Sequence, residues 1–219
     1  MRSARLWIST SVASLLLIGC ASAPPRPSFA QFRAENPRSI LVVPVINNTV
    51  DVDAASYFLA TISKPLAERG YYVFPVNMVR SVLADDGLND ANLVHSGDPR
   101  RLGKLFGADA VMYISIERWD ARYVVLATRV TVELNYSLKS ARTGQELWKN
   151  HETMVYQPQG SNAGVAGLIA DAIAAAITKA VPNYIPLAQQ ANAQAIDLKG
   201  TGLPAGPYDS MYGKDSDDY

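Results

Sequence analysis

Uninterrupted apolar runs alternate with amphipathic stretches through the first half of the chain. Residues 39–46 (SILVVPVI) and 71–76 (YYVFPV) are apolar on both faces, which is typical of short strands buried in the middle of a sheet. Between them, apolar side chains recur at helical spacing over residues 55–69, and Gly70 follows. This pattern predicts a helix that ends at Gly70, with a kink at Pro65.

Two shorter helices and a third strand are predicted next. Asn77 has a side chain suited to capping a helix that runs to about Ala84. Residues 99–106 begin with proline and are followed by Gly107, which indicates another short helix. The apolar run DAVMYISIERW at residues 109–119 begins the third strand.

The pattern changes in the second half of the chain. Residues 129–139 alternate strictly between apolar and polar side chains, which indicates an antiparallel strand with one polar face. Thr143 and Gly144 then supply a turn, and a further strand runs to Tyr156. Two βα units followed by an antiparallel meander predict the α/β class, with a mixed β-sheet flanked by helices.

An alanine-rich segment, residues 160–181, is the last predicted helix. It carries an apolar stripe flanked by alanines, which let another backbone approach closely. The stripe serves either core packing or contact with a partner. A membrane span is disfavoured, because Asp171 at its middle would cost about 2.5 kcal/mol or more. The stripe consists of Val165, Ile169, Ile173 and Ile177.

The two ends of the chain differ in composition from its middle. Residues 20–38 begin with the only cysteine and hold four prolines, which is typical of a semi-rigid tether. Residues 197–219 combine glycine, proline and aspartate with few apolar side chains, which predicts a disordered tail. The α/β domain is therefore expected over residues 39–196.

The first residues are typical of an export signal. Arg2 and Arg5 precede an apolar stretch, which is too short to span a bilayer core as a permanent helix. The sequence LIGC ending at Cys20 resembles the lipobox of bacterial lipoproteins, in which the cysteine thiol is diacylated and the signal, here residues 1–19, is removed. The alternative is an ordinary secretory signal with an incidental cysteine.

The resemblance to a lipobox has consequences for location. Two or three acyl chains, palmitate among them, would anchor the protein stably where one chain would be marginal. In the lipoproteins that the sequence resembles, an aspartate directly after the cysteine keeps the protein from being sorted to the outer membrane. Here Ala21 occupies that position, so the resemblance implies an outer-membrane location. Loss of Arg2 and Arg5 leaves 18 basic against 20 acidic residues, a formal charge of −2. No strong positive field is left to attract nucleic acid.

Candidate catalytic chemistry is sparse. His95 and His151 are too few and too far apart in sequence to indicate a zinc site by spacing, and both are expected on the surface or in loops. No nucleophile elbow, phosphate-binding loop or dinucleotide fingerprint is present. Residues 95–98 (HSGD) place a base, a hydroxyl and an acid side by side, but a catalytic triad needs them to converge in space. No cofactor or metal is therefore expected.

One loop, residues 47–53, is a candidate binding site because it leaves the carboxyl end of the first predicted parallel strand. Its polar residues can ligate a hard cation or bind a partner. The alternative is a structural role, since Asn and Asp favour turns and helix caps. These residues are Asn47, Asn48, Asp51 and Asp53.

Four phrases of the sequence carry a resemblance to a family. ILVVPVINNT, KPLAERGYYVFPV, LFGADAVMYISIERW and TGQELW occur in that order after the lipobox. They resemble the proteobacterial lipoproteins of domain-of-unknown-function family seven-nine-nine, and more distantly the curli-secretion lipoprotein and the N-terminal domain of TolB. The resemblance implies a TolB-N-like α/β fold, an outer-membrane anchor and no established activity. It also implies assembly partners among envelope lipoproteins.

The sequence thus predicts a non-enzymatic, lipid-anchored adaptor in an envelope or secretion assembly, facing the periplasm. Its expected partners are the membrane, through acylated Cys20, and a curli-secretion-like lipoprotein or further copies of the chain. The alternative is a solute-binding protein or envelope enzyme that uses loop 47–53.

Overall fold

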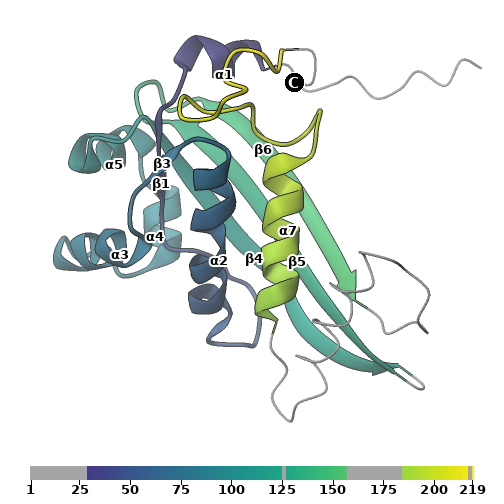
Figure 1. The fold of residues 1–219 in the computed structure, drawn as a ribbon. Helices are drawn as coiled ribbons and strands as arrows, with labels where there is room; N and C mark the ends of the chain where they lie inside the picture. Colours follow the sequence, from purple (N-terminus) through teal and green to yellow (C-terminus); the bar gives the residue numbers. More distant parts are fainter. Residues whose placement is uncertain (1–28, 125–126, 157–183, 217–218) are drawn as a thin grey trace, which may run out of the picture.

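A mixed β-sheet forms the centre of the computed structural model, which describes residues 29–124, 127–156, 184–216 and 219 (Figure 1). The strand order is β3-β1-β4-β5-β6, and β2 pairs with β4 beyond the end of β1. The pairings of β1 with β3 and β4, and of β2 with β4, are parallel; those of β5 with β4 and β6 are antiparallel. The predicted mixed sheet is therefore confirmed. The strands are β1 (Ser39–Val42), β2 (Ile46–Asn47), β3 (Tyr72–Val73), β4 (Ala110–Val124), β5 (Ala127–Ser140) and β6 (Glu146–Tyr156).

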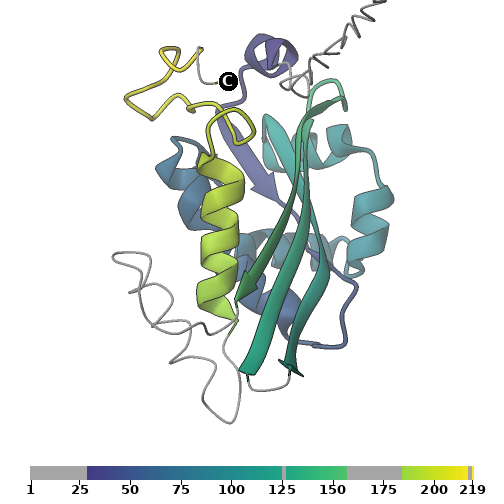
Figure 2. The same cartoon turned by 90° about the vertical axis from the view of Figure 1, so that its right-hand side faces the viewer.

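Helices cover both faces of this sheet. Figure 2 shows α2 and α7 on one side of the strands and the short helices α3 to α5 on the other. α1 lies across one end of the domain (Figure 1). The helices of the described residues are α1 (Ala30–Glu35), α2 (Ala54–Glu68), α3 (Val76–Asp85), α4 (Ala91–Ser96), α5 (Pro99–Phe106) and α7 (Ile185–Asp197).

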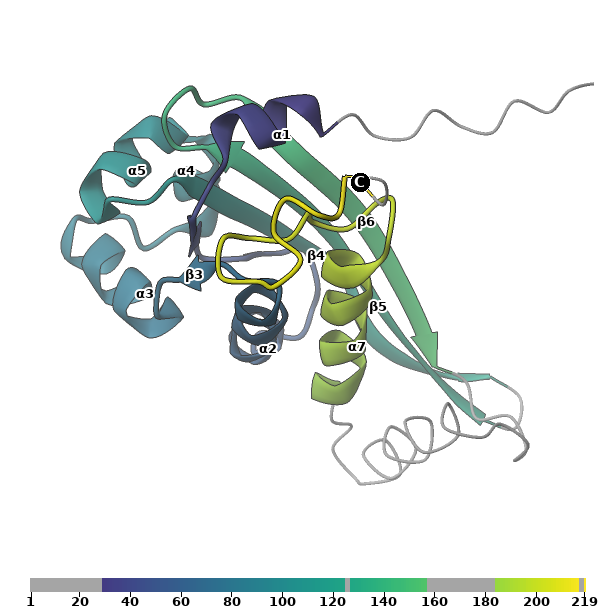
Figure 3. The same ribbon diagram turned by 45° about the horizontal axis from the view of Figure 1, so that its top comes forward.

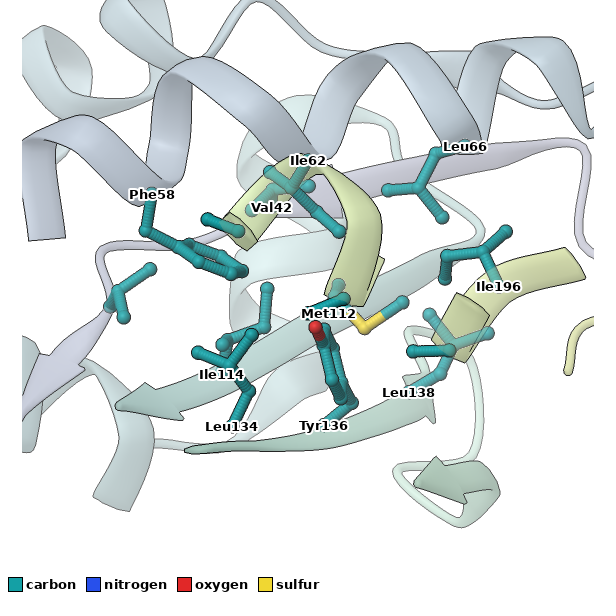
Figure 4. Close-up of a cluster of buried hydrophobic side chains, with 14 of the residues drawn as sticks. Val42, Phe58, Ile62, Leu66, Met112, Ile114, Leu134, Tyr136, Leu138 and Ile196 are labelled. Atoms are coloured by element: carbon teal, nitrogen blue, oxygen red, sulfur yellow. The ribbon is translucent and has the colours of Figure 1, made fainter. Parts of the chain in front are cut away.

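The larger core lies between the sheet and the pair α2 and α7. Phe58 and Ile62 of α2 are fully buried against alternate residues of β4 and β5 (Figure 4). A buried polar chain crosses this core: the Tyr136 hydroxyl donates to Asn192 Oδ1 at 2.6 Å, and Asn192 Nδ2 donates to Thr61 Oγ1 at 2.8 Å. These bonds satisfy groups that would otherwise be costly to bury, and they fix α7 against α2 and β5.

Three predicted elements match the structure closely. α2 ends before Gly70, which has a φ of +84°, and α5 spans the predicted residues 99–106. α2 continues through Pro65 to Glu68, and the kink stays a prediction. The alternation over residues 129–139 is that of β5, whose apolar positions are all buried.

The prediction for residues 71–76 was wrong in detail. Only Tyr72 and Val73 form a strand, and Tyr72 is half exposed because β3 lies at the sheet edge. Pro75 has no N–H for the strand ladder, so pairing stops and α3 begins directly after it. Asn77 consequently lies inside the helix instead of capping it.

The disordered tail predicted for residues 197–219 is also wrong for the residues described. Leu203 is fully buried, and the Arg69 guanidinium donates to Asp215 Oδ2 at 3.3 Å. Gly206 crosses Gly70 so closely that an added Cβ would collide with the Gly70 carbonyl. Figure 3 shows this segment, in yellow, looping across the end of the domain near α1. Few apolar residues suffice here because backbone hydrogen bonds, such as Gly206 N–H to Arg69 O at 2.8 Å, fix the path.

The tether predicted for residues 20–38 is wrong for residues 29–38, the part that the structure describes. Phe29 and Phe32 are buried, and the Phe29 ring packs edge-on against Tyr219 with centroids 5.7 Å apart. α1 is thus part of the folded domain. Signal residues 1–19, Cys20 and the alanine-rich stripe of Val165, Ile169, Ile173 and Ile177 lie outside the described residues. Within the described ranges, no helix has the length and apolar character needed to cross a membrane.

Candidate functional site

The polar residues of loop 47–53 bond mainly to one another. Asn47 Nδ2 donates to the Asp51 carbonyl at 2.7 Å, while Asn47 Oδ1 accepts from Thr49 N–H at 3.1 Å and from Thr49 Oγ1 at 2.7 Å. Asp51 Oδ1 accepts from Asp53 N–H at 3.0 Å. Asp53 occupies the N-cap position of α2 without a side-chain cap bond. Asn47 and Asp51 therefore have the structural role that was the alternative to ligand binding: they stabilise the turn of this loop.

The side chains that the loop exposes are apolar. Val50 is 97% exposed and Val52 is 87% exposed. Sequence reasoning missed both residues because it followed the polar letters of the loop. The sequence signal was TVDVD at residues 49–53, where two valines lie outside every predicted helix and buried strand.

Asn48 connects the loop to the sheet face opposite α2 and α7. Its Nδ2 donates to Glu117 Oε2 at 3.0 Å. The other oxygen of Glu117 accepts from Ser115 Oγ at 2.5 Å and from Asn135 Nδ2 at 3.0 Å. These hydrogen bonds, with that from Ser115 the largest cause, lower the pKa of the Glu117 carboxyl. A carboxylate stabilised in this way is a weak base.

His151 extends the polar row to β6. Sheet register places it opposite Asn135, and its Nδ1 lies 2.6 Å from Asn135 Oδ1. Its Nε2 lies 3.6 Å from Glu133 Oε1. Among the described residues no three His, Cys, Asp or Glu side chains converge in a way that would hold a metal ion. The row is a hydrogen-bonded surface in which each group already has a partner.

The HSGD sequence contributes to structure. His95 Nε2 lies 2.9 Å from the Pro44 carbonyl oxygen, and the Ser96 hydroxyl donates to Leu93 O at 2.9 Å. Asp98 caps α5 by accepting from Arg100 N–H at 2.9 Å. The three side chains therefore serve separate local contacts, and a triad is not formed.

His95 gives the fold a dependence on pH. Burial lowers the pKa of its imidazole below the ordinary value of 6.5. As pH falls below about 6.5, His95 takes up a proton in the unfolded chain more readily than in the folded protein. The free energy of unfolding therefore decreases as the pH is lowered below this value. Urea unfolding from pH 7 toward pH 5 should show wild type losing more stability than His95→Gln. Equal losses in both proteins would contradict this role.

Comparisons with known proteins give the chain its family. Residues 28–208 match the family described as "Putative lipoprotein GNA1162-like". A Neisseria meningitidis serogroup B protein named "Putative lipoprotein NMB1124/NMB1162" is 34% identical over 164 residues, which cover 74% of this chain and 76% of the relative. The crystal structure of lipoprotein GNA1162 from Neisseria meningitidis is 35% identical, with a TM-score of 0.55 over 64% of this chain and 98% of that one.

A weaker likeness is found to the PelC dodecamer from Paraburkholderia phytofirmans, at 15% identity and a TM-score of 0.42, covering 73% of this chain and 84% of that one. The family of this chain follows from the family match and the Neisseria relative alone, and the likeness to PelC has no part in it. On their basis, the chain belongs to the GNA1162-like lipoprotein family.

Proposed function

We propose that this protein is an envelope lipoprotein, anchored through acylated Cys20, that acts as a non-enzymatic adaptor by contacting another protein through Val50 and Val52. The observation that carries the proposal is the extreme exposure of these two valines on an internally bonded loop. The loop lies at the end of the domain away from α1 (Figure 1). Because α1 is the described helix nearest to Cys20 in the sequence, the proposal has the loop directed away from the anchor.

The energetics favour a protein contact for this loop. Burying one valine side chain contributes about 1.5–3 kcal/mol, so two valines separated by one residue are a substantial contact for a partner with an apolar pocket. The hydrogen bonds of Asn47 already fix the loop, which lowers the entropy cost of binding. Because the side chains of Asn47 and Asp51 bond inside the loop and Asn48 bonds to Glu117, the loop supports an adaptor better than the alternative solute-binding protein or enzyme.

The remaining details of the proposal come from the sequence. The alanine at position 21 supports an outer-membrane location, and the domain is proposed to face the periplasm. Resemblance to the curli-secretion lipoprotein supports a secretion-associated assembly, and a TolB-like relationship stays a prediction. Other envelope lipoproteins, or further copies of the chain, are the proposed partners.

Replacing the two valines tests the proposal. Val50→Ser with Val52→Ser should abolish co-purification of envelope partners from native membranes, with the lipid anchor intact. Surface substitutions usually change stability by less than about 0.5 kcal/mol, so the melting temperature should stay near wild type. Val155→Ser, at a half-exposed valine on β6, is the control and should retain every partner. Retention of the same partners by the double variant would contradict the proposed contact.

A further inference from the structure

A second site lies at the opposite end of the domain from the valine loop. α5, the end of α1 and the turn between β5 and β6 line an open cavity of about 660 Å³. Figure 3 shows these three elements gathered at one end of the molecule. Small-molecule sites generally occupy about 300–1,000 Å³, so the cavity has room for a ligand larger than a simple ion.

The carboxylates that line the cavity are already engaged. Glu35 pairs with the Arg142 guanidinium at 2.8 Å. Asp98 accepts from the Arg100 guanidinium through both oxygens at distances between 2.8 and 3.0 Å, which together with the Arg100 N–H bond lowers the pKa of its carboxyl. Asp109 Oδ2 accepts from the backbone N–H groups of residues 38 and 39 and from the Ser39 hydroxyl, each at 3.0 Å.

Two cations on the cavity wall are left without such partners. Within the described part of the chain, the side chains of Arg101 and Lys104 form no hydrogen bond or ion pair. They stand three positions apart on α5, which places them on one face of that helix. The guanidinium of Arg101 offers a planar pair of donors and the ammonium of Lys104 a point charge, a combination suited to phosphate oxygens.

Small residues leave this wall open. Gly103 fits α5 tightly against Ala141, since an added Cβ there would collide with the Ala141 side chain. Gly107 ends the helix with a φ of +71°, and an added Cβ at this position would meet no atom within 4 Å. The cavity is therefore fixed on one side by close helix packing and open beside Gly107.

The position of the cavity relates it to the proposed anchor. Glu35 belongs to α1, and only nine peptide units separate Phe29, at the start of this helix, from Cys20. Even fully extended, those residues reach about 30 Å. A membrane role for the cavity rests on the proposed anchor at Cys20, whereas the cation pair and the cavity themselves do not.

We propose that this cavity binds a phosphate-bearing anion, with Arg101 and Lys104 as its direct ligands. At the end of the domain nearest the anchor, an anionic phospholipid headgroup is one source of that chemistry, and a soluble phosphate compound is the other. Binding a headgroup would hold the domain against its membrane and direct the valine loop away from it.

Pyrophosphate binding by the detergent-purified protein tests the site without reference to the anchor. Wild type should show a rise in melting temperature with sodium pyrophosphate that sodium chloride of equal ionic strength does not reproduce. Arg101→Gln with Lys104→Gln should weaken this binding about tenfold or more, because it removes two charge-assisted ligands. Lys64→Gln with Arg80→Gln, on α2 and α3, makes the same change of charge elsewhere and should bind like wild type.

Reconstitution into vesicles identifies the source of the phosphate. Slower amide exchange over residues 103–109 in phosphatidylglycerol vesicles than in phosphatidylcholine vesicles, lost in the Arg101 and Lys104 variant, supports a lipid headgroup. Pyrophosphate binding with equal exchange in both vesicles supports a soluble ligand. The absence of specific pyrophosphate binding, or equal binding by both double variants, would overturn the site. Failure of lipid attachment at Cys20 would overturn the proposed anchor and leave the pyrophosphate result standing.

Discussion

Leu203→Ala is expected to lower the free energy of unfolding by about 2–5 kcal/mol, the range typical of a leucine truncated to alanine in a packed core. Leu203 is completely buried and belongs to the larger core, as does Ile196. Its backbone N–H donates to Ile196 O at 2.8 Å. The truncation removes apolar contacts and leaves a void beneath the segment that crosses Gly70. Urea unfolding of the full chain measures the effect.

Leu198→Ala is the matched control for this measurement. Leu198 lies just before the same crossing segment and is half exposed, so its truncation should change stability by less than about 0.5 kcal/mol. Equal small effects of the two substitutions would mean that residues 198–216 do not pack on the domain. That outcome would restore the disordered tail that the composition predicted.

Cys20→Ala is expected to abolish lipid attachment altogether. Acylation of the thiol comes before removal of the signal in the proposed pathway, so the variant should also remain unprocessed at this site. Without the two or three acyl chains that make anchoring stable, the domain loses its proposed attachment. Radiolabelled palmitate should enter wild type and fail to enter the variant. A labelled variant that still fractionates with the outer membrane would show that Cys20 is not the anchor.

Periodicity predicted the sheet better than it predicted the ends of the chain. The buried run of β1 and the alternation of β5 are strong signals because each reflects a single environment along the whole strand. α7 was not predicted because its core face consists largely of alanines, in a segment that also holds three glutamines and one asparagine. Asn192 shows the difficulty: it is a buried polar residue whose role depends on Tyr136 and Thr61, two partners far away in sequence.

The sequence predicted the location of loop 47–53 but not which of its side chains would be free to bind a partner. Loop 47–53 does follow the parallel strands, as the topology implied, yet Asn47 and Asp51 bond inside it. Whether a polar side chain turns toward its own backbone or toward a ligand depends on local geometry that composition does not encode. The cavity beside Arg101 and Lys104 was not predicted at all, because it is assembled from α1, α5 and the turn after β5.

Photo-crosslinking in native membranes tests the proposed adaptor contact most directly. A photoreactive residue placed at position 50 or 52, in the lipid-anchored protein, should give a discrete adduct of higher mass containing an envelope protein. The same residue at position 80, on the exposed surface of α3, should give none. Adducts of the same mass at positions 50 and 52, absent at position 80, are the result that we expect. No adduct at either valine position, or identical adducts at all three, would contradict a protein contact made by this loop.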